Sequence, residues 1–307
     1  MISMREAFFN RVFEYAKTNP DIIVLTTDFP GPFVDQFHVQ LSGQFINTGI
    51  SEQNTVLVAA GLAKAGKKVI IASIAAFISM RCYEQIRLYL ADQNLDIKLV
   101  GFRSGLSYGT VGTSHHAVED IALMRILPNM NVFLPSTNKQ VEAFADWCCT
   151  TREPAYIRLD RMAMEETYSD GFTPGAGFHR MRDGETVIIA NGYMMQTAIV
   201  AADELNGNNI KTGIWDLSRI PIDESVFCDS LRGVRQLISV EEHVAPGGVG
   251  SYLLEVMNNH GVTVPLRRIA LDMRDGYYHG YGTRDEMHDV CGIGVRQIVE
   301  AARGVNA

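Results

Sequence analysis

The sequence alternates short apolar runs with segments of helical periodicity, and this alternation limits the chain to a parallel α/β architecture. The runs are rich in Ile and Val and show little polar alternation, as in strands that are buried on both faces. They lie at Asp21–Phe29, Phe45–Ile50, Lys68–Phe77, Asp96–Phe102, Asn131–Pro135 and Ala155–Leu159. Segments such as 5–17, 53–65 and 80–92 read as helices between them. Alternating strand and helix predict a parallel sheet flanked by helices.

A stretch without periodicity divides the chain into two such series. Residues 162–182 (MAMEETYSDGFTPGAGFHRMR) combine Gly, Pro and charged residues, which favours a linker. Further strands are expected after it at Thr186–Asn191, Thr212–Leu217, Gln236–Glu241 and Leu266–Leu271. We therefore predict an α/β protein of two domains, residues 1–165 and 183–307, joined by a linker at 166–182. Each domain should be a mostly parallel sheet flanked by helices, and 307 residues suit two domains.

Composition excludes several classes of function. A formal net charge of −8 argues against a broad nucleic-acid-binding face, although a few arginines could still bind a small anion. No apolar run approaches the roughly 20 residues of a membrane span, and the N-terminus lacks the apolar core of a signal peptide. The five cysteines form no CxxC pair, so we expect free thiols, no metal site and a cytoplasmic location.

The segment Asn47–Asn54 carries the most informative acidic residue. A strand is expected to end at Gly49, and Ser51 is a natural N-cap for the helix that follows. Glu52 then lies in the first turn, where the helix dipole alone would stabilise a carboxylate. Taken by itself, this pattern leaves a structural role and a functional role open.

The order of the motifs along the chain narrows the choice. Gly49–Gln53 reads GISEQ, Phe77 ends the next strand, and Gly112–His116 reads GTSHH. Val240–His243 and the glycine-rich Gly247–Ser251 follow in the second half. This order resembles the transketolase family of thiamine diphosphate enzymes over nearly the whole chain: the first domain resembles the family's pyrimidine-binding domain, the second its C-terminal domain.

The resemblance implies a role for four residues at thiamine diphosphate. Glu52 would be the carboxylic acid that faces the aminopyrimidine ring and favours its imino form, whose nitrogen accepts the thiazolium proton. Phe77 would stack on the pyrimidine, although core packing explains this residue equally well. Asp28 and Tyr83 would also contact the cofactor. All four lie in the segment expected to form the first domain.

The resemblance also implies substrate-binding residues. His115 matches the histidine that contacts the substrate oxygen and shuttles protons, while His116 replaces the usual Gln and fits a structural role as well. Arg103, Arg158 and Arg5 match positions that bind the substrate phosphate, and ordinary ion pairs are the alternative for each.

Three positions qualify the likeness. Val111 stands where transketolases usually carry an acidic residue that binds the acceptor hydroxyl, and a valine side chain accepts no hydrogen bond. Leu134 stands where a phosphate-binding arginine is usual. These departures put standard sugar-phosphate transfer in question. Arg161 lies close to Arg158, and we interpret it as a surface ion-pair residue.

The chain lacks the family's diphosphate module, whose GDG motif would help to hold Mg²⁺. Arg182-Asp183-Gly184 is a near match in the wrong place, so Asp183 is interpreted as a turn residue. Met1 falls where the pyrimidine-binding domain should begin, so we expect the missing module on a separate N-terminal subunit that binds Mg²⁺.

The expected assembly is α2β2, with the thiamine diphosphate shared between subunits. The expected reaction moves a two-carbon ketol unit from a ketose, or ketose phosphate, to an aldehyde or other carbonyl acceptor. The alternatives are the β subunit of a 2-oxo acid dehydrogenase and a non-catalytic partner subunit.

Overall fold

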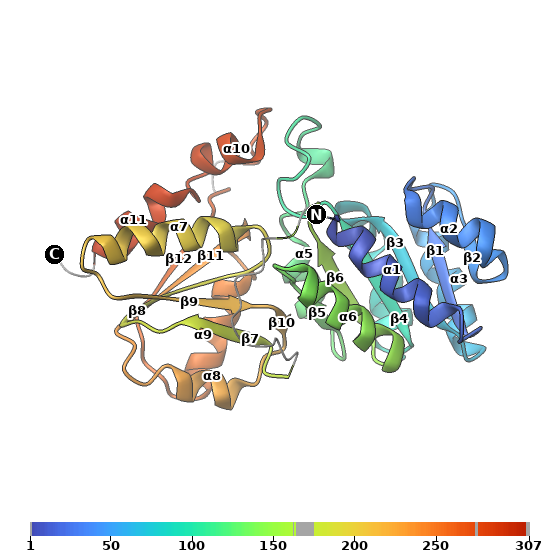
Figure 1. Ribbon diagram of the computed structural model, residues 1–307, viewed down its shortest axis with the longest axis horizontal. Helices are drawn as coiled ribbons and strands as arrows, with labels where there is room; N and C mark the ends of the chain where they lie inside the picture. The colour runs from blue at the N-terminus through green and yellow to red at the C-terminus, as the bar shows by residue number, and fades with distance from the viewer. Residues whose placement is uncertain (1, 162, 164–174, 274–275, 305–307) are drawn as a thin grey trace.

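The computed structural model describes residues 2–161, 163, 175–273 and 276–304. Two α/β domains lie side by side, each built on one sheet with helices packed against it (Figure 1). The first domain contains a seven-stranded sheet and the second a five-stranded one. This confirms the predicted two-domain α/β fold.

The first sheet has the strand order β10-β5-β6-β4-β3-β1-β2. All of its strands are parallel except β10 at one edge, which pairs antiparallel with β5. The strands are β1 (Ile22–Thr26), β2 (Phe45–Asn47), β3 (Lys68–Ile74), β4 (Ile97–Phe102), β5 (Asn131–Phe133), β6 (Ala155–Leu159) and β10 (Arg219–Ile220). The central strands β1, β4 and β6 are buried along their whole length, which explains their continuous apolar sequences.

Helices cover both faces of this sheet, and an apolar core lies on each side. They are α1 (Met4–Ala16), α2 (Pro32–Gln40), α3 (Glu52–Lys64), α4 (Tyr83–Gln85), α5 (Asp120–Arg125) and α6 (Asn138–Thr150). Two 3-10 turns, η1 (Ser42–Gln44) and η4 (Thr113–His115), complete the domain. Capping boxes begin α1 and α6, because Ser3 and Thr137 each accept from the third backbone N–H of their helix.

The segment expected as one helix at 80–92 differs from a regular α-helix. Two π-helical turns, η2 (Phe77–Arg81) and η3 (Ile86–Ala91), flank the short α4. A π turn inserts one residue into the helical ladder and turns the following side chains, and such turns are frequent at functional sites. The irregular turn η2 begins at Phe77, one of the predicted site residues.

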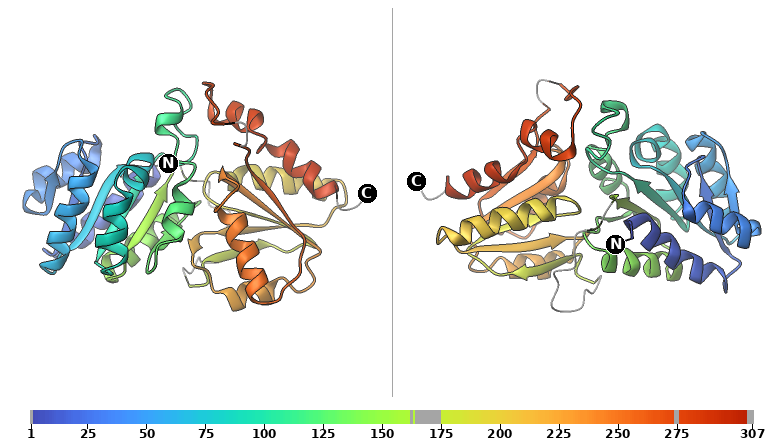
Figure 2. Two further views of the ribbon diagram at one scale, coloured as in Figure 1. Left: turned by 180° about the vertical axis from the view of Figure 1, so that it is seen from behind. Right: turned by 45° about the horizontal axis from the view of Figure 1, so that its top comes forward.

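The second sheet has the order β12-β11-β8-β9-β7, and only β7 runs antiparallel to its neighbour. Its strands are β7 (Phe178–Arg182), β8 (Thr186–Ala190), β9 (Thr212–Leu217), β11 (Gln236–Val244) and β12 (Leu266–Leu271). Its helices are α7 (Met194–Gly207), α8 (Glu224–Ser230), α9 (Val249–Asn259), α10 (Arg284–Val290) and α11 (Val295–Arg303). Figure 2 shows the domain from two further sides.

The predicted linker at 166–182 lies partly outside the described residues. Its last five residues form β7, so the linker prediction was wrong there. Only Phe178 of this edge strand is buried, and its other residues are partly or fully exposed. Because its sequence is short and charged, it shows no apolar run that would predict a strand. Asp183 lies in the short connection between β7 and β8 and pairs with Arg180.

Several contacts join the two domains. The second half of the chain supplies β10 to the first sheet, and Arg219 of β10 donates to Asn131 of β5. Arg125 of α5 forms two hydrogen bonds with Glu255 of α9. His243 of β11 accepts from the backbone N–H of Ala122. Among the described residues, no helix has both the length and the apolar character needed to cross a membrane.

Candidate active site

Glu52 is buried at the first turn of α3. Its side chain is only 2% exposed, although it carries a carboxyl group. Gly49 reverses the chain between β2 and α3 with a φ of 71°, a conformation that glycine adopts without strain. Ser51 precedes the helix, but its hydroxyl donates to Thr48 O instead of capping α3. Ser51 is thus the N-cap residue of α3, as expected, but its side chain makes no capping bond.

Arg81 holds both Glu52 and Phe77. Its guanidinium donates to Glu52 Oε2 over 2.8 Å and lies 4.1 Å from the centroid of the Phe77 ring. Phe77 and Arg81 lie four residues apart in turn η2, and Arg81 reaches Glu52 at the start of α3. A planar cation that both stacks and donates combines the two contacts that Arg makes best.

His115 extends this row of contacts. Its ring packs edge-on against Phe77, with centroids 4.9 Å apart, and against Tyr108, with centroids 5.1 Å apart. The guanidinium of Arg103 lies over the Tyr108 ring, 4.9 Å from its centroid. Burial lowers the pKa of His115, and the Arg81 cation acts in the same direction. A neutral imidazole at this position can accept a proton from a substrate hydroxyl.

A pocket with three guanidinium groups adjoins Arg103. Its volume is about 320 Å³, and Arg5, Arg103 and Arg161 line it together with the carboxylates of Glu6 and Asp160. Arg5 lies against the rings of Phe29, Phe33 and Phe102. Burial lowers the pKa of Arg5, and the charge of Arg103 acts in the same direction. Several cations held together in one concave site favour an anionic ligand.

Arg161 was missed by the sequence reasoning, which assigned Arg158 to the substrate instead. The structure separates the two residues. Arg158 lies within β6 at 5% exposure, where it donates to Asp120 and to the carbonyls of Ala117 and Glu242. Arg161 follows the carboxyl end of β6 and lines the pocket. Ligands of parallel sheets bind at the carboxyl ends of the strands, and this rule could have pointed to Arg161 from the sequence.

Three other predicted residues lie around the row. Asp28 is exposed after β1 and accepts from Asn47, beside the turn that leads to α3. The Tyr83 hydroxyl donates to the backbone of Leu123 in α5, so the structure does not bring it to Glu52. His116 is 4% exposed, and its Nε2 has no hydrogen-bond partner among the described residues. Burial lowers the pKa of His116.

The residues present fit the pyrimidine end of thiamine diphosphate. Phe77 offers a ring face, and Glu52 offers a buried carboxyl group directly beside it. The flat, nitrogen-bearing guanidinium of Arg81 already makes the two contacts that an aminopyrimidine would make. Its side chain is 45% exposed, so it can move into solvent. No cluster of three His, Cys, Asp or Glu side chains that could hold a metal ion occurs in the described part of the chain.

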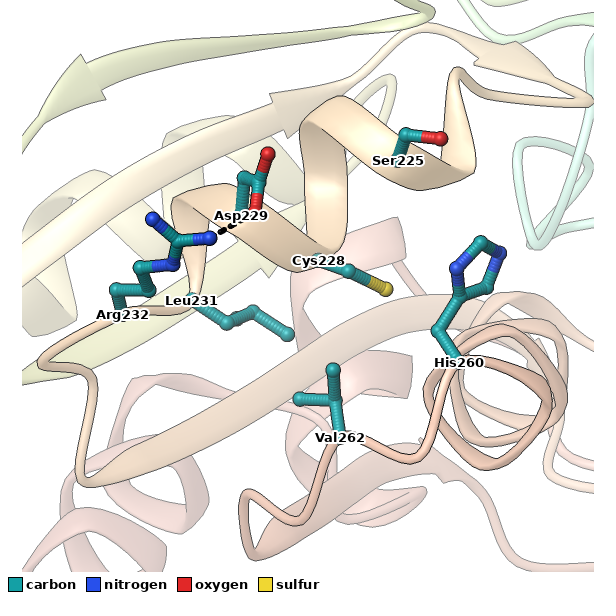
Figure 3. A pocket seen from close by; sticks show the side chains of 7 residues that line it. All are labelled: Ser225, Cys228, Asp229, Leu231, Arg232, His260 and Val262. Carbon is teal, nitrogen blue, oxygen red and sulfur yellow. Dashed lines mark hydrogen bonds and ion pairs between the residues drawn. The ribbon is translucent and has the colours of Figure 1, made fainter.

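Another pocket lies in the second domain, away from this row. Cys228 of α8 points toward His260 and Val262, which follow α9, and Ser225 and Asp229 of the same helix also line the pocket (Figure 3). The Arg232 guanidinium at its rim is bonded to Asp229. None of the predicted site residues lines this pocket, so we do not assign the active site to it.

Comparisons with known proteins agree with the geometry. Residues 1–166 match the transketolase pyrimidine binding domain, and residues 178–298 match the transketolase C-terminal domain. Fold and site together define a pair of transketolase-type α/β domains. The chain belongs to the transketolase family, whose domains imply the use of thiamine diphosphate.

Several relatives are separate subunits of split enzymes. One subunit of the apulose-4-phosphate transketolase of Actinobacillus succinogenes is 32% identical, and the match covers 96% of each chain. The 6-deoxy-6-sulfo-D-fructose transketolase subunit SqwH of a Clostridium species is 31% identical, and the match covers 98% of this chain and 94% of that one. A solved split-gene transketolase, described as an inactive beta4 tetramer, superposes with a TM-score of 0.85. Its sequence is 30% identical, and the match covers 99% of this chain and 97% of that one.

Proposed function

We propose that this chain is the C-terminal subunit of a split transketolase that moves a two-carbon ketol unit from a ketose to an aldehyde or other carbonyl acceptor. One observation carries the proposal. The buried carboxyl of Glu52, the ring of Phe77 and the imidazole of His115 lie in one continuous row of contacts. These three groups supply a proton-holding acid, a flat apolar surface and a base for a substrate oxygen.

Each residue has a defined task in this reaction. When bound, thiamine diphosphate supplies the electron sink that stabilises the transferred unit. Glu52 would donate a hydrogen bond from its carboxyl to a ring nitrogen of the cofactor, and Phe77 would give that ring a flat apolar face. His115 takes the proton of a substrate hydroxyl at its imidazole and returns it to the product oxygen. Tyr108 packs on His115 and limits the movement of its ring.

We propose that the substrate carries an anionic group. Arg5, Arg103 and Arg161 line a pocket, and Arg103 of this pocket also lies over the ring of Tyr108, so that a phosphate, sulfonate or carboxylate would be recognised there. The relatives named above act on a sugar phosphate and on a sulfo sugar, which supports this assignment. Val111 is 43% exposed in the loop between Tyr108 and His115, and its side chain accepts no hydrogen bond from an acceptor hydroxyl.

We further propose that an N-terminal subunit supplies the diphosphate and Mg²⁺ sites in an α2β2 assembly in the cytoplasm. Exposed apolar side chains lie beside Glu52, on the edge strand β2 and around α3. Ile46, Ile50 and Leu57 are 36%, 74% and 43% exposed. Contiguous exposed apolar residues mark interaction surfaces. A subunit seated there would cover Glu52 and exclude water from the cofactor.

The test is turnover by the chain together with its N-terminal partner. Glu52→Gln removes the acid and keeps the shape of the side chain, so turnover should fall by at least about 100-fold while the two subunits still co-purify. Glu84→Gln changes an exposed glutamate near the same turns and should leave turnover unchanged. Near-normal turnover by Glu52→Gln would contradict the proposal and favour a non-catalytic partner subunit.

A further inference from the structure

A carboxylate stands in the wall of the arginine-lined pocket. Asp160 follows β6 directly and lines the pocket with Arg5, Arg103 and Arg161, although its side chain is only 2% exposed. A buried negative charge beside an anionic ligand raises the free energy of binding, because few waters screen the repulsion. The pocket can bind an anion tightly only if the charge of Asp160 is balanced.

The balancing charge comes from the other domain. Arg284, the first residue of α10, donates from Nη1 to Asp160 Oδ1 over 2.7 Å. The same guanidinium donates to both carboxylate oxygens of Glu242, at 2.8 Å from Nε and 2.5 Å from Nη2. The Arg284 side chain is 13% exposed, and its guanidinium carbon lies 3.9 Å from the centroid of the Tyr193 ring. Arg284 is therefore held in one orientation on three sides.

Glu242 keeps Arg284 in place. Burial alone would raise the pKa of Glu242, but Arg284 and His288 lower it well below its ordinary value, so the carboxylate is charged. His288 of α10 adds a hydrogen bond of 2.5 Å to Glu242 Oε1. A Cβ atom on Gly105 would lie 1.7 Å from Glu242 Oε2, so the loop after β4 can approach this carboxylate only because residue 105 is glycine.

The same network reaches the loop that carries His115. The Ser107 hydroxyl lies 3.1 Å from Asp160 Oδ1 and 2.6 Å from the carbonyl of Ser104, and it can donate its one proton to either acceptor. Two residues before Arg284, the backbone N–H of Gly282 donates to the carbonyl of Gly109 over 3.2 Å. In Figure 1 the loop before α10 lies beside this loop of the first domain. Arg284 thus sits where the second domain meets the wall of the pocket.

We propose that Arg284 is a positioning residue for the substrate's anionic group: it pairs with Asp160, orients it and offsets part of its charge, so that the C-terminal domain sets the anion affinity of a pocket in the first domain. This inference rests on the proposed function only for the identity of the anion. Arg284 is paired with two carboxylates, so the ligand's charge meets Arg5, Arg103 and Arg161 and does not meet a free Asp160.

Binding of inorganic phosphate to the full chain tests this inference without turnover or a partner. Calorimetric titration at constant ionic strength should give a phosphate Kd about tenfold higher for Arg284→Met than for the wild type, which corresponds to about 1.4 kcal/mol. Arg284→Lys keeps the charge and should raise the Kd by no more than about threefold. Arg182→Met, at an exposed ion pair with Asp203, is the matched control and should bind phosphate as the wild type does.

The decisive variant combines two substitutions. Asp160→Asn in the Arg284→Met background removes the unpaired carboxylate that lines the pocket. It should restore the wild-type Kd, because Glu242 does not line the pocket, and a purely structural loss would not allow this rescue. Failure of this rescue overturns the inference. The inference is also overturned if Arg284→Met leaves the phosphate Kd unchanged while Arg161→Met weakens binding. That result leaves the assignment of the pocket and the proposed function intact. If the wild-type chain binds no phosphate, both the inference and the assignment of this pocket as an anion site are overturned. Turnover of the Glu52 variants tests the proposed reaction separately.

Discussion

Arg81 lies between Phe77 and Glu52, stacked on the ring at 4.1 Å and bonded to the carboxylate at 2.8 Å. The guanidinium therefore gives the buried carboxylate of Glu52 a partner when no cofactor ring is present. A carboxylate at 2% exposure would otherwise lose its hydration without compensation. Arg81 covers one face of the Phe77 ring, so a pyrimidine can stack on that face only after Arg81 has left it.

The first prediction concerns this pair. Arg81→Met should lower the free energy of unfolding of the chain by about 2 kcal/mol, since it leaves Glu52 buried without its partner. Glu52→Gln should cost less, because a neutral amide needs no cation. The double variant should lose less stability than the sum of the two single-variant losses, by about 1 kcal/mol. Urea unfolding at one protein concentration measures all three values.

The control for this cycle is Arg87→Met, at an exposed arginine in the next π-helical turn, which should change stability by less than about 0.5 kcal/mol. Additive losses in the double variant would show that Arg81 and Glu52 do not interact in solution. An unchanged stability for Arg81→Met would show that solvent hydrates Glu52.

The second prediction separates the two arginines around β6. Arg158→Lys should destabilise the chain by roughly 3 kcal/mol, because a lysine cannot replace the bonds to Asp120 and to two carbonyls. Its phosphate affinity should stay within about twofold of the wild type, whereas Arg161→Lys should weaken binding with little loss of stability. Unfolding and phosphate titration of both variants provide the comparison. Weaker phosphate binding by Arg158→Lys would contradict this prediction and support the assignment of Arg158 to the substrate site.

The sequence predicted the fold well because buried parallel strands leave a strong signal. Runs such as Val69–Ser73 and Val187–Ala190 are apolar or small without interruption, and both lie inside strands. The weak signals failed: β7 carries three basic residues at the edge of its sheet, and β10 is only two residues long. Pairing across the two domains creates β10, and no local pattern contains that information.

The site was predictable in its order along the chain and less so in its side-chain partners. Motif order placed Glu52, Phe77 and His115, and the structure brings these three together. Arg81 escaped attention because a π turn changes which residues share a helical face. Arg284 lies 124 residues after Asp160, so its role depends on packing between domains, which spacing in the sequence does not reveal.

The third prediction is a pH dependence at the domain interface. His243 of β11 is fully buried; its Nε2 accepts from Ala122 N–H, and its Nδ1 donates to the carbonyl of Val244. The bond from Ala122 requires a neutral ring, because a protonated Nε2 cannot accept, whereas Nδ1 can donate to Val244 in either protonation state. Burial lowers the pKa of His243 from 6.5 to about 4, while Asp120 opposes the shift in part.

The sign of the effect follows from proton binding. Between pH 6.5 and about 4 the unfolded chain binds a proton at His243 that the folded chain does not bind, so acidification favours unfolding. The wild type should lose about 2 kcal/mol of stability to this residue between pH 7.5 and 5, and about 3 kcal/mol over the whole window. His243→Gln can keep one acceptor and one donor without titrating, so urea unfolding at the two pH values should show a smaller loss by that amount. His38→Gln, at an exposed histidine of α2, should follow the wild type. Equal losses in the wild type and His243→Gln would show that the buried imidazole does not couple folding to pH, and that the bond between β11 and α5 survives protonation.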